Sequence, residues 1–118
     1  MPPLDRDLAY LWDMRQAAGW IASFMRGVSF VGYSNDKKLQ SAVERQLEIL
    51  GEAAGRVSAE FRQAHPEIPG RQMIGLRNIL IHEYGEVKAD RVWEIATTGI
   101  DQLIYLLASL IPPIDEGG

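Results

Sequence analysis

A stripe of apolar residues with helical period runs through the middle of the chain and constrains its fold more than any other feature. Its members are spaced by three or four residues: Leu39, Val43, Leu47, Leu50, Ala54, Val57 and Phe61. Apolar residues at this spacing line one face of a helix, which must be buried against another element. We therefore expect one long helix over about 36–63, with a bend near Gly51 or Gly55. These glycines, in ILGEAAG, would let another helix approach closely.

Three other segments share this period and predict helices over about 5–28, 71–85 and 89–111. Turn-forming residues separate the four helices: GYSND at 32–36, where Ser34 or Asp36 would cap the next helix, and HPEIPG at 65–70, whose two prolines disfavour helix. The last helix should begin near Ala89 or Asp90, with Asp90 as a candidate cap. Its expected inner face consists of Val92, Ile95, Ala96, Gly99, Leu103, Leu106 and Leu110.

No segment alternates in the manner of a β-strand followed by a hairpin turn. The expected fold class is therefore all-α, as an antiparallel bundle of four main helices. A length of 118 residues with 47% hydrophobic residues suits a single domain over 1–118. We expect frayed ends at 1–4 and 112–118.

Composition limits the classes of function. The chain has no cysteine, only two histidines and no HExxH pattern, so we expect no metal site and no cofactor. We expect neither a signal peptide nor a membrane partner, because no apolar run approaches the roughly 20 residues that span a bilayer. A cytoplasmic protein is the resulting expectation. A net charge of −4 weighs against a general nucleic-acid binder, although a small basic cleft remains compatible with it.

The segment RNILIHEYG, residues 77–85, places an arginine, a histidine and a tyrosine among aliphatic residues. At 100° per residue, Arg77 and Tyr84 would share one helix face, whereas Arg77 and His82 would point about 140° apart. Arg77 and His82 can therefore converge only if the helix loosens before His82, or if a second subunit supplies one of them. By spacing alone, a structural role for all three residues is the stronger interpretation.

Together these groups would suit RNA cleavage. A histidine titrates near neutrality and can move a proton to or from a ribose 2′-hydroxyl, while an arginine holds phosphate oxygens. DNA lacks the attacking hydroxyl and would not be a substrate. Glu44 would either orient a cleft arginine or be a solvated carboxylate, with solvation favoured. His65 is expected to be an exposed loop histidine.

The successive runs LGEAAGRVS, HPEIPGRQMIGLRNILIHEYGEV and RVWEI strongly resemble the HepT-like members of the HEPN superfamily, over about 39–110. The resemblance implies a homodimeric, metal-independent ribonuclease toxin of a type VII-like toxin–antitoxin module. It places the catalytic pair on Arg77 and His82 and a supporting polar residue on Asn78. It also implies that a cognate nucleotidyltransferase antitoxin transfers AMP to Tyr84 and thereby silences the toxin.

Two positions depart from the pattern of this family. Gly70 stands where many relatives have tryptophan, and Lys88 stands where many have an aspartate that would cap the last helix. Two functions from different classes stay open. The intact motif favours a ribonuclease toxin, whereas the acidic net charge favours a non-catalytic helical homodimer that serves a nucleotidyltransferase as substrate or scaffold.

Overall fold

The computed structural model describes residues 5–111, and the predicted fraying of 1–4 and 112–118 lies outside them. The described part is helical, without a strand, which confirms the all-α prediction. Its elements are α1 (Asp5–Met25), α2 (Phe30–Ser34), α3 (Lys37–Arg56), α4 (Ala59–Ala64), α5 (Gly70–His82), α6 (Gly85–Glu94), the π-helical η1 (Ile95–Gly99) and α7 (Ile100–Leu110).

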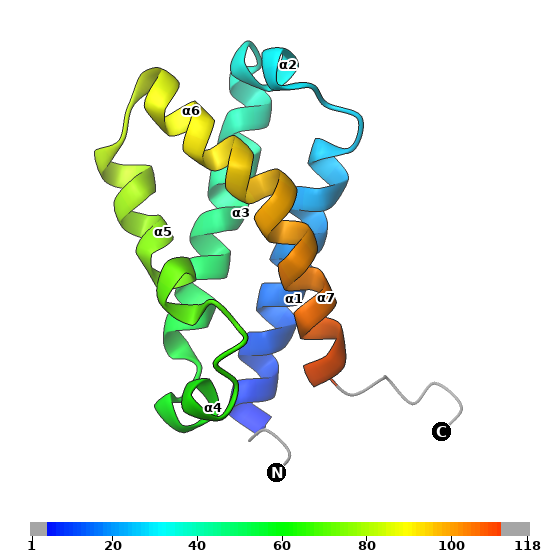
Figure 1. Ribbon diagram of the computed structural model, residues 1–118, viewed down its shortest axis with the longest axis vertical. Helices are drawn as coiled ribbons and strands as arrows, with labels where there is room; N and C mark the ends of the chain where they lie inside the picture. The colour runs from blue at the N-terminus through cyan, green and yellow to red at the C-terminus, as the bar shows by residue number, and fades with distance from the viewer. Residues whose placement is uncertain (1–4, 112–118) are drawn as a thin grey trace.

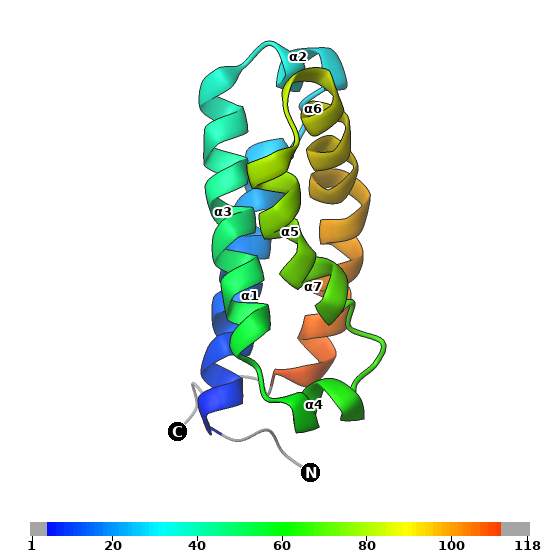
Figure 2. The same cartoon turned by 90° about the vertical axis from the view of Figure 1, so that its left-hand side faces the viewer.

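Four long rods form the body of the molecule: α1, α3, α5 and the continuous helix from α6 through η1 to α7 (Figure 1). They run alternately up and down, so the predicted antiparallel arrangement of four main helices is confirmed. The helix α3 packs against both α1 and α5, and α1 also packs against α7. The short helices lie at the two ends of the bundle, α2 at one and α4 at the other (Figures 1 and 2).

Aliphatic side chains from all four rods form one core. Its large members with the least exposure are Leu11, Met14, Ile21, Val43, Leu47, Leu50, Val92, Ile100 and Leu107. At Gly51 the backbones of α3 and α5 approach so closely that an added Cβ would lie 2.9 Å from the carbonyl oxygen of Met73. The predicted role of Gly51 in close helix packing is therefore correct.

The prediction of one helix over 36–63 is wrong, because the chain leaves the helical conformation at Val57 and Ser58. The hydroxyl of Ser58 accepts a hydrogen bond from the backbone N–H of Phe61 and so caps α4. Asp7, only 2% exposed, accepts two bonds from Ser58, at 2.8 Å from the backbone N and 2.7 Å from Oγ. A contact between residues 51 positions apart thus fixes the break, and neither Gly51 nor Gly55 interrupts α3.

The connection between the first two rods also differs from its prediction. The helix α1 ends at Met25, three residues early, and Gly27 follows with a φ of +71°. Part of the predicted break at 32–36 is helical, because α2 starts directly after its N-cap residue Ser29 and continues to Ser34. Of the two predicted caps for α3, Asp36 is correct: its Oδ1 accepts from the N–H of Leu39 at 3.0 Å.

The last rod begins at Gly85, four residues before the predicted start, so Asp90 lies inside α6 and does not cap it. Its buried stripe also differs from the predicted one and consists of Val92, Ala96, Ile100, Leu103 and Leu107. The cause is η1, where the N–H of Ile100 bonds to the oxygen of Ile95, five residues back. A π-helical turn holds more residues than an α-helical turn, so every later side chain is rotated relative to the α-helical pattern.

Candidate active site at the end of α5

The motif residues lie at the C-terminal half of α5 and in the turn that follows it. Arg77, Asn78 and His82 are exposed on the helix. Glu83 ends α5, and its N–H donates to the oxygen of Ile79 at 3.1 Å. Tyr84 stands between α5 and α6 in an extended conformation, and 78% of it is exposed. Figure 1 shows this turn at the end of the bundle that also carries α2.

Arg77 and His82 diverge within one subunit. Because α5 remains α-helical as far as His82, the helix does not loosen before the histidine. At 100° per residue the two side chains leave the helix about 140° apart. Over residues 5–111, neither makes a hydrogen bond or an ion pair. Both groups are therefore free to meet a ligand or another chain.

An apolar strip separates the two motif residues on the surface of α5. The helical rotation from Arg77 toward His82 passes Ile81, Ile74 and Asn78, in that order. Ile74 is 38% exposed and Ile81 is 50% exposed, although both are large aliphatic side chains. The strip, defined by Ile74, Asn78 and Ile81, thus lies between the arginine and the histidine and is only partly covered by this subunit.

Tyr84 does not share the helix face of Arg77, contrary to the sequence-based expectation. The helix ends two residues earlier, and the backbone at Tyr84 has φ −136° and ψ 159°. Its side chain makes no capping bond to α6. The phenol therefore projects from a turn and not from a helix face, which leaves it accessible from solvent.

Two ion pairs attach α6 to the elements on either side of it. Arg91 Nε lies 3.0 Å from Glu83 Oε1, which joins α6 to the end of α5. Lys88 Nζ lies 2.6 Å from Glu44 Oε1, which joins α6 to α3. Glu44 thus bonds a lysine of its own subunit, whereas the sequence favoured a solvated carboxylate over one that orients an arginine of the cleft. Since Tyr84 is the residue before α6, these pairs also fix its position.

The sequence reasoning missed Glu83, Lys88 and Arg91 as partners around the motif. Their charges are visible in the sequence, but the pairing depends on how α6 lies against the end of α5 and against α3. The second oxygen of Glu83 is buried without a hydrogen-bond partner among the described residues. A buried oxygen without a hydrogen-bond partner lowers the stability of the fold. The bond between the other oxygen of Glu83 and Arg91 is therefore the main stabilising contact of this carboxylate.

Behind the turn, α2 packs against α6 through aromatic side chains. The ring of Trp93 lies 5.6 Å from that of Phe30 and 6.0 Å from that of Tyr33, measured between centroids. Tyr33 is 1% exposed, and burial together with the nearby charge of Glu44 raises the pKa of its hydroxyl. Tyr33 is therefore a neutral core phenol, in contrast to the exposed Tyr84.

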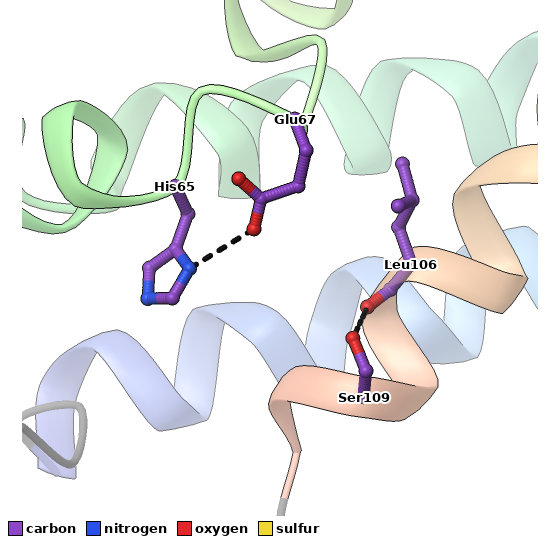
Figure 3. Close-up of polar contacts among 4 residues, drawn as sticks. All are labelled: His65, Glu67, Leu106 and Ser109. Carbon is purple, nitrogen blue, oxygen red and sulfur yellow. Dashed lines mark hydrogen bonds and ion pairs between the residues drawn. The ribbon is translucent and has the colours of Figure 1, made fainter.

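The second histidine, His65, lies outside this site. It lies before the start of α5, whereas the motif lies at the other end of this 13-residue helix, which is about 18 Å long. Its Nδ1 is 3.1 Å from Glu67 Oε1 and its ring is 4.4 Å from that of Phe61, so it is partly covered and not a free loop histidine (Figure 3). A backbone hydrogen bond and the bond to His65 both lower the pKa of Glu67.

Two general features of the described residues bear on the class of site. Among residues 5–111, no three histidine, aspartate or glutamate side chains are grouped so that they could hold a metal ion. In the same part of the chain, none of the helices has the length and apolar character needed to cross a membrane.

A small antiparallel helical bundle that exposes R-x4-H-x-Y at the end of its third long helix has the features of a HEPN domain. The family model described as "Ribonuclease HepT-like" matches residues 14–110. The chain belongs to this HepT-like family, as its sequence motifs had indicated.

Similar proteins bear related names. A protein of Thermococcus cleftensis named "Probable ribonuclease HepT" is 40% identical over 94 residues, which cover 80% of this chain and 86% of that protein. Two proteins of Methanocaldococcus jannaschii, provisionally named as RNases, are also similar. One is 34% identical over 95 residues (80% of this chain, 87% of the relative), and the other 31% over 112 residues (94% and 97%). No solved structure gives a significant match.

Proposed function

We propose that this protein is a metal-independent endoribonuclease in which Arg77 and His82 serve one reaction. The single observation that supports this most is the exposure of both unpaired side chains at one helix end, in a chain of the HepT-like family. His82 would take the proton of a ribose 2′-hydroxyl, whose oxygen then attacks the adjacent phosphorus and displaces the 5′-oxygen, and the imidazolium would return the proton to this leaving oxygen. Arg77 would bind the phosphate and oppose its growing charge, and Asn78 would support it.

The site would be completed by a second copy of the chain. Arg77 and His82 diverge on α5, and the apolar strip between them needs a partner. Two α5 helices packed strip to strip about a two-fold axis would bury Ile74 and Ile81 of both subunits. If the axis runs parallel to the two helices, the same packing would bring Arg77 of one subunit toward His82 of the other, because such an axis exchanges the two flanks of the strip.

Tyr84 would act as the switch of the enzyme. Its exposed phenol is accessible to a nucleotidyltransferase that holds ATP. The phenolic oxygen would bond to the α-phosphorus of ATP, the phenol would lose its proton, and pyrophosphate would leave. The attached AMP adds a negative charge beside Arg77 and His82, where an RNA phosphate would otherwise bind. This chain would then be the toxin of a type VII-like toxin–antitoxin module, with the transferase as the antitoxin.

A non-catalytic role is the second candidate, and the net charge of −4 favours it because RNA binding is promoted by positive charge. In that case the dimer would serve a nucleotidyltransferase as substrate or scaffold only. The deciding experiment incubates the purified, unmodified protein with single-stranded RNA in EDTA.

Cleavage to products with 2′,3′-cyclic phosphate ends is expected, and His82→Ala or Arg77→Ala should reduce the rate by roughly 10²–10⁴-fold. A wild-type protein that leaves RNA intact would support the scaffold. Cleavage of DNA, or loss of cleavage in EDTA, would contradict the mechanism.

A further inference from the structure

A groove opens beside Tyr84, between α2 and the first turns of α6. It measures about 600 Å³, and its lining includes Phe30, Val31, Lys37, Gly85, Glu86 and Asp90. The helix α2 lies against the start of α6 at this end of the bundle (Figure 2). Gly85 belongs to the groove and is also the neighbour of Tyr84 in sequence, so the groove starts where the exposed phenol stands.

Apolar side chains are unusually exposed around this groove. Val31 is 68% exposed, Phe30 38%, and Val87, three residues after Tyr84, 58%. With Tyr84 itself, they make up half of the large hydrophobic residues that are exposed in the described part of the chain. Phe30 and Val31 line the groove itself, whereas Tyr84 and Val87 flank its lining residues Gly85 and Glu86 in the sequence. Exposed apolar surface of this kind is typical of a site of protein contact.

We propose that this groove is the docking surface for the nucleotidyltransferase that modifies Tyr84. The inference rests on the proposed modification and adds to it where the partner binds. An enzyme that attaches AMP to Tyr84 must cover the turn around it, and the lining of the groove includes Gly85, the next residue of that turn. Val31 would receive an apolar side chain of the transferase, and the transferase must reach across α6 to α2.

The charges of the groove support this occupant over RNA and over a second copy of the chain. Three charged side chains line it, Glu86 and Asp90 from α6 and Lys37 from the start of α3, all exposed and, within residues 5–111, without an ion pair. Two carboxylates and one lysine leave the groove with a net charge of −1, which disfavours the phosphates of RNA and favours basic side chains of a protein. The apolar strip of α5 is the better surface for a second copy, because it lies between Arg77 and His82.

The test measures transfer of AMP to this protein by the proposed cognate nucleotidyltransferase, with ATP and Mg²⁺. Two variants alter the groove: Val31→Asp places a charge in its apolar part, and the double substitution Glu86→Arg/Asp90→Arg reverses its acidic side. Each has a control of the same kind elsewhere. Tyr105→Asp changes an 80% exposed residue of α7, and Asp13→Arg reverses an exposed charge on α1.

Both groove variants should lower kcat/KM for modification of Tyr84 about tenfold or more, while the controls stay within about twofold of wild type. Circular dichroism, dimer mass and cleavage of RNA should be unchanged in all four. If the wild type is modified and the groove variants are modified equally fast, the docking surface is elsewhere, although the modification stands.

If the wild type accepts no AMP, the proposed modification fails and this inference fails with it. Loss of the dimer in the groove variants would instead assign the groove to contact between copies. Loss of RNA cleavage in a variant that remains dimeric would assign it to RNA. Either result overturns the docking surface.

Discussion

Glu83 and Arg91 form an ion pair of 3.0 Å that joins the residue after the end of α5 to the last turn of α6. Glu83 stands between His82 and Tyr84, so this contact fixes the two motif residues relative to the bundle. The carboxylate has one paired oxygen and one buried oxygen without a partner among the described residues. Its position in the turn therefore depends on Arg91.

Arg91→Ala should lower the free energy of unfolding by about 1–3 kcal/mol, because it leaves a partly buried carboxylate without its partner. Arg45→Ala is the matched control, since it removes an arginine that contacts Glu48 at 3.5 Å on an exposed helix surface. Arg45→Ala should lower the free energy of unfolding by less than about 1 kcal/mol. Urea denaturation measures both, and equal losses would show that the Glu83 contact has no special importance.

The proposed shared site predicts complementation between inactive variants. Arg77→Ala and His82→Ala proteins, each inactive alone, should regain about a quarter of wild-type cleavage when mixed in equal amounts and allowed to exchange subunits. Half of the dimers would then be mixed, and each mixed dimer would hold one complete site. Light scattering should give about twice the monomer mass of 13.2 kDa. A mixture that stays inactive despite proven exchange would place both residues of a site in one subunit.

Tyr84→Phe should fold, dimerise and cleave RNA, yet escape inhibition by the nucleotidyltransferase. The phenyl ring keeps the size of the side chain but lacks the oxygen that would accept AMP. Intact-mass measurement after incubation with the transferase and ATP should show added AMP on wild type only. A label that persists in Tyr84→Phe would move the acceptor to Tyr10, Tyr33 or Tyr105, and full cleavage by modified protein would contradict the switch.

Two glycines in helix interiors should respond in opposite directions to alanine. Gly51→Ala would place a Cβ 2.9 Å from the carbonyl oxygen of Met73, so α3 and α5 must separate and stability should fall by about 1–3 kcal/mol. Gly19→Ala, on α1, has no atom within 4 Å of the new Cβ. Gly19→Ala should raise the free energy of unfolding by about 0.5–1 kcal/mol, because alanine has a better helix propensity than glycine. Thermal denaturation would refute the proposed close approach if Gly51→Ala were equally stabilising.

Alkaline pH should destabilise the protein through Tyr33. Burial and Glu44 raise the pKa of this phenol in the folded state, so above the ordinary tyrosine value of about 10 the unfolded chain loses the proton first. The contribution to stability is complete below about pH 10 and falls as the pH rises further. Tyr33→Phe should reduce this alkaline loss when unfolding is measured at a series of pH values. An unchanged pH dependence would contradict the prediction.

The sequence by itself determined which face of α3 is buried, because the period of apolar residues is a local property. The members of the predicted stripe from Val43 to Ala54 form the core face of α3, and Asp36 was recognisable as its cap. The order of the runs around RNILIHEYG indicated the family, which the comparison with the HepT-like family then established. The composition of Arg77, His82 and Tyr84 suggested their chemistry, and their roles remain predictions.

Only the tertiary structure decided where helices break and which charges pair. Asp7 accepts hydrogen bonds from Ser58 and so fixes the end of α3, although the two residues lie far apart in the chain. The spacing of apolar residues cannot predict such a contact. The π-helical η1 rotates the buried stripe of the last rod onto Ile100 and Leu107. Because α5 ends before Glu83, Tyr84 does not belong to the helix that carries Arg77. Glu44 forms an ion pair with Lys88. Each result depends on how whole helices are placed against one another, whereas sequence periodicity describes each helix alone.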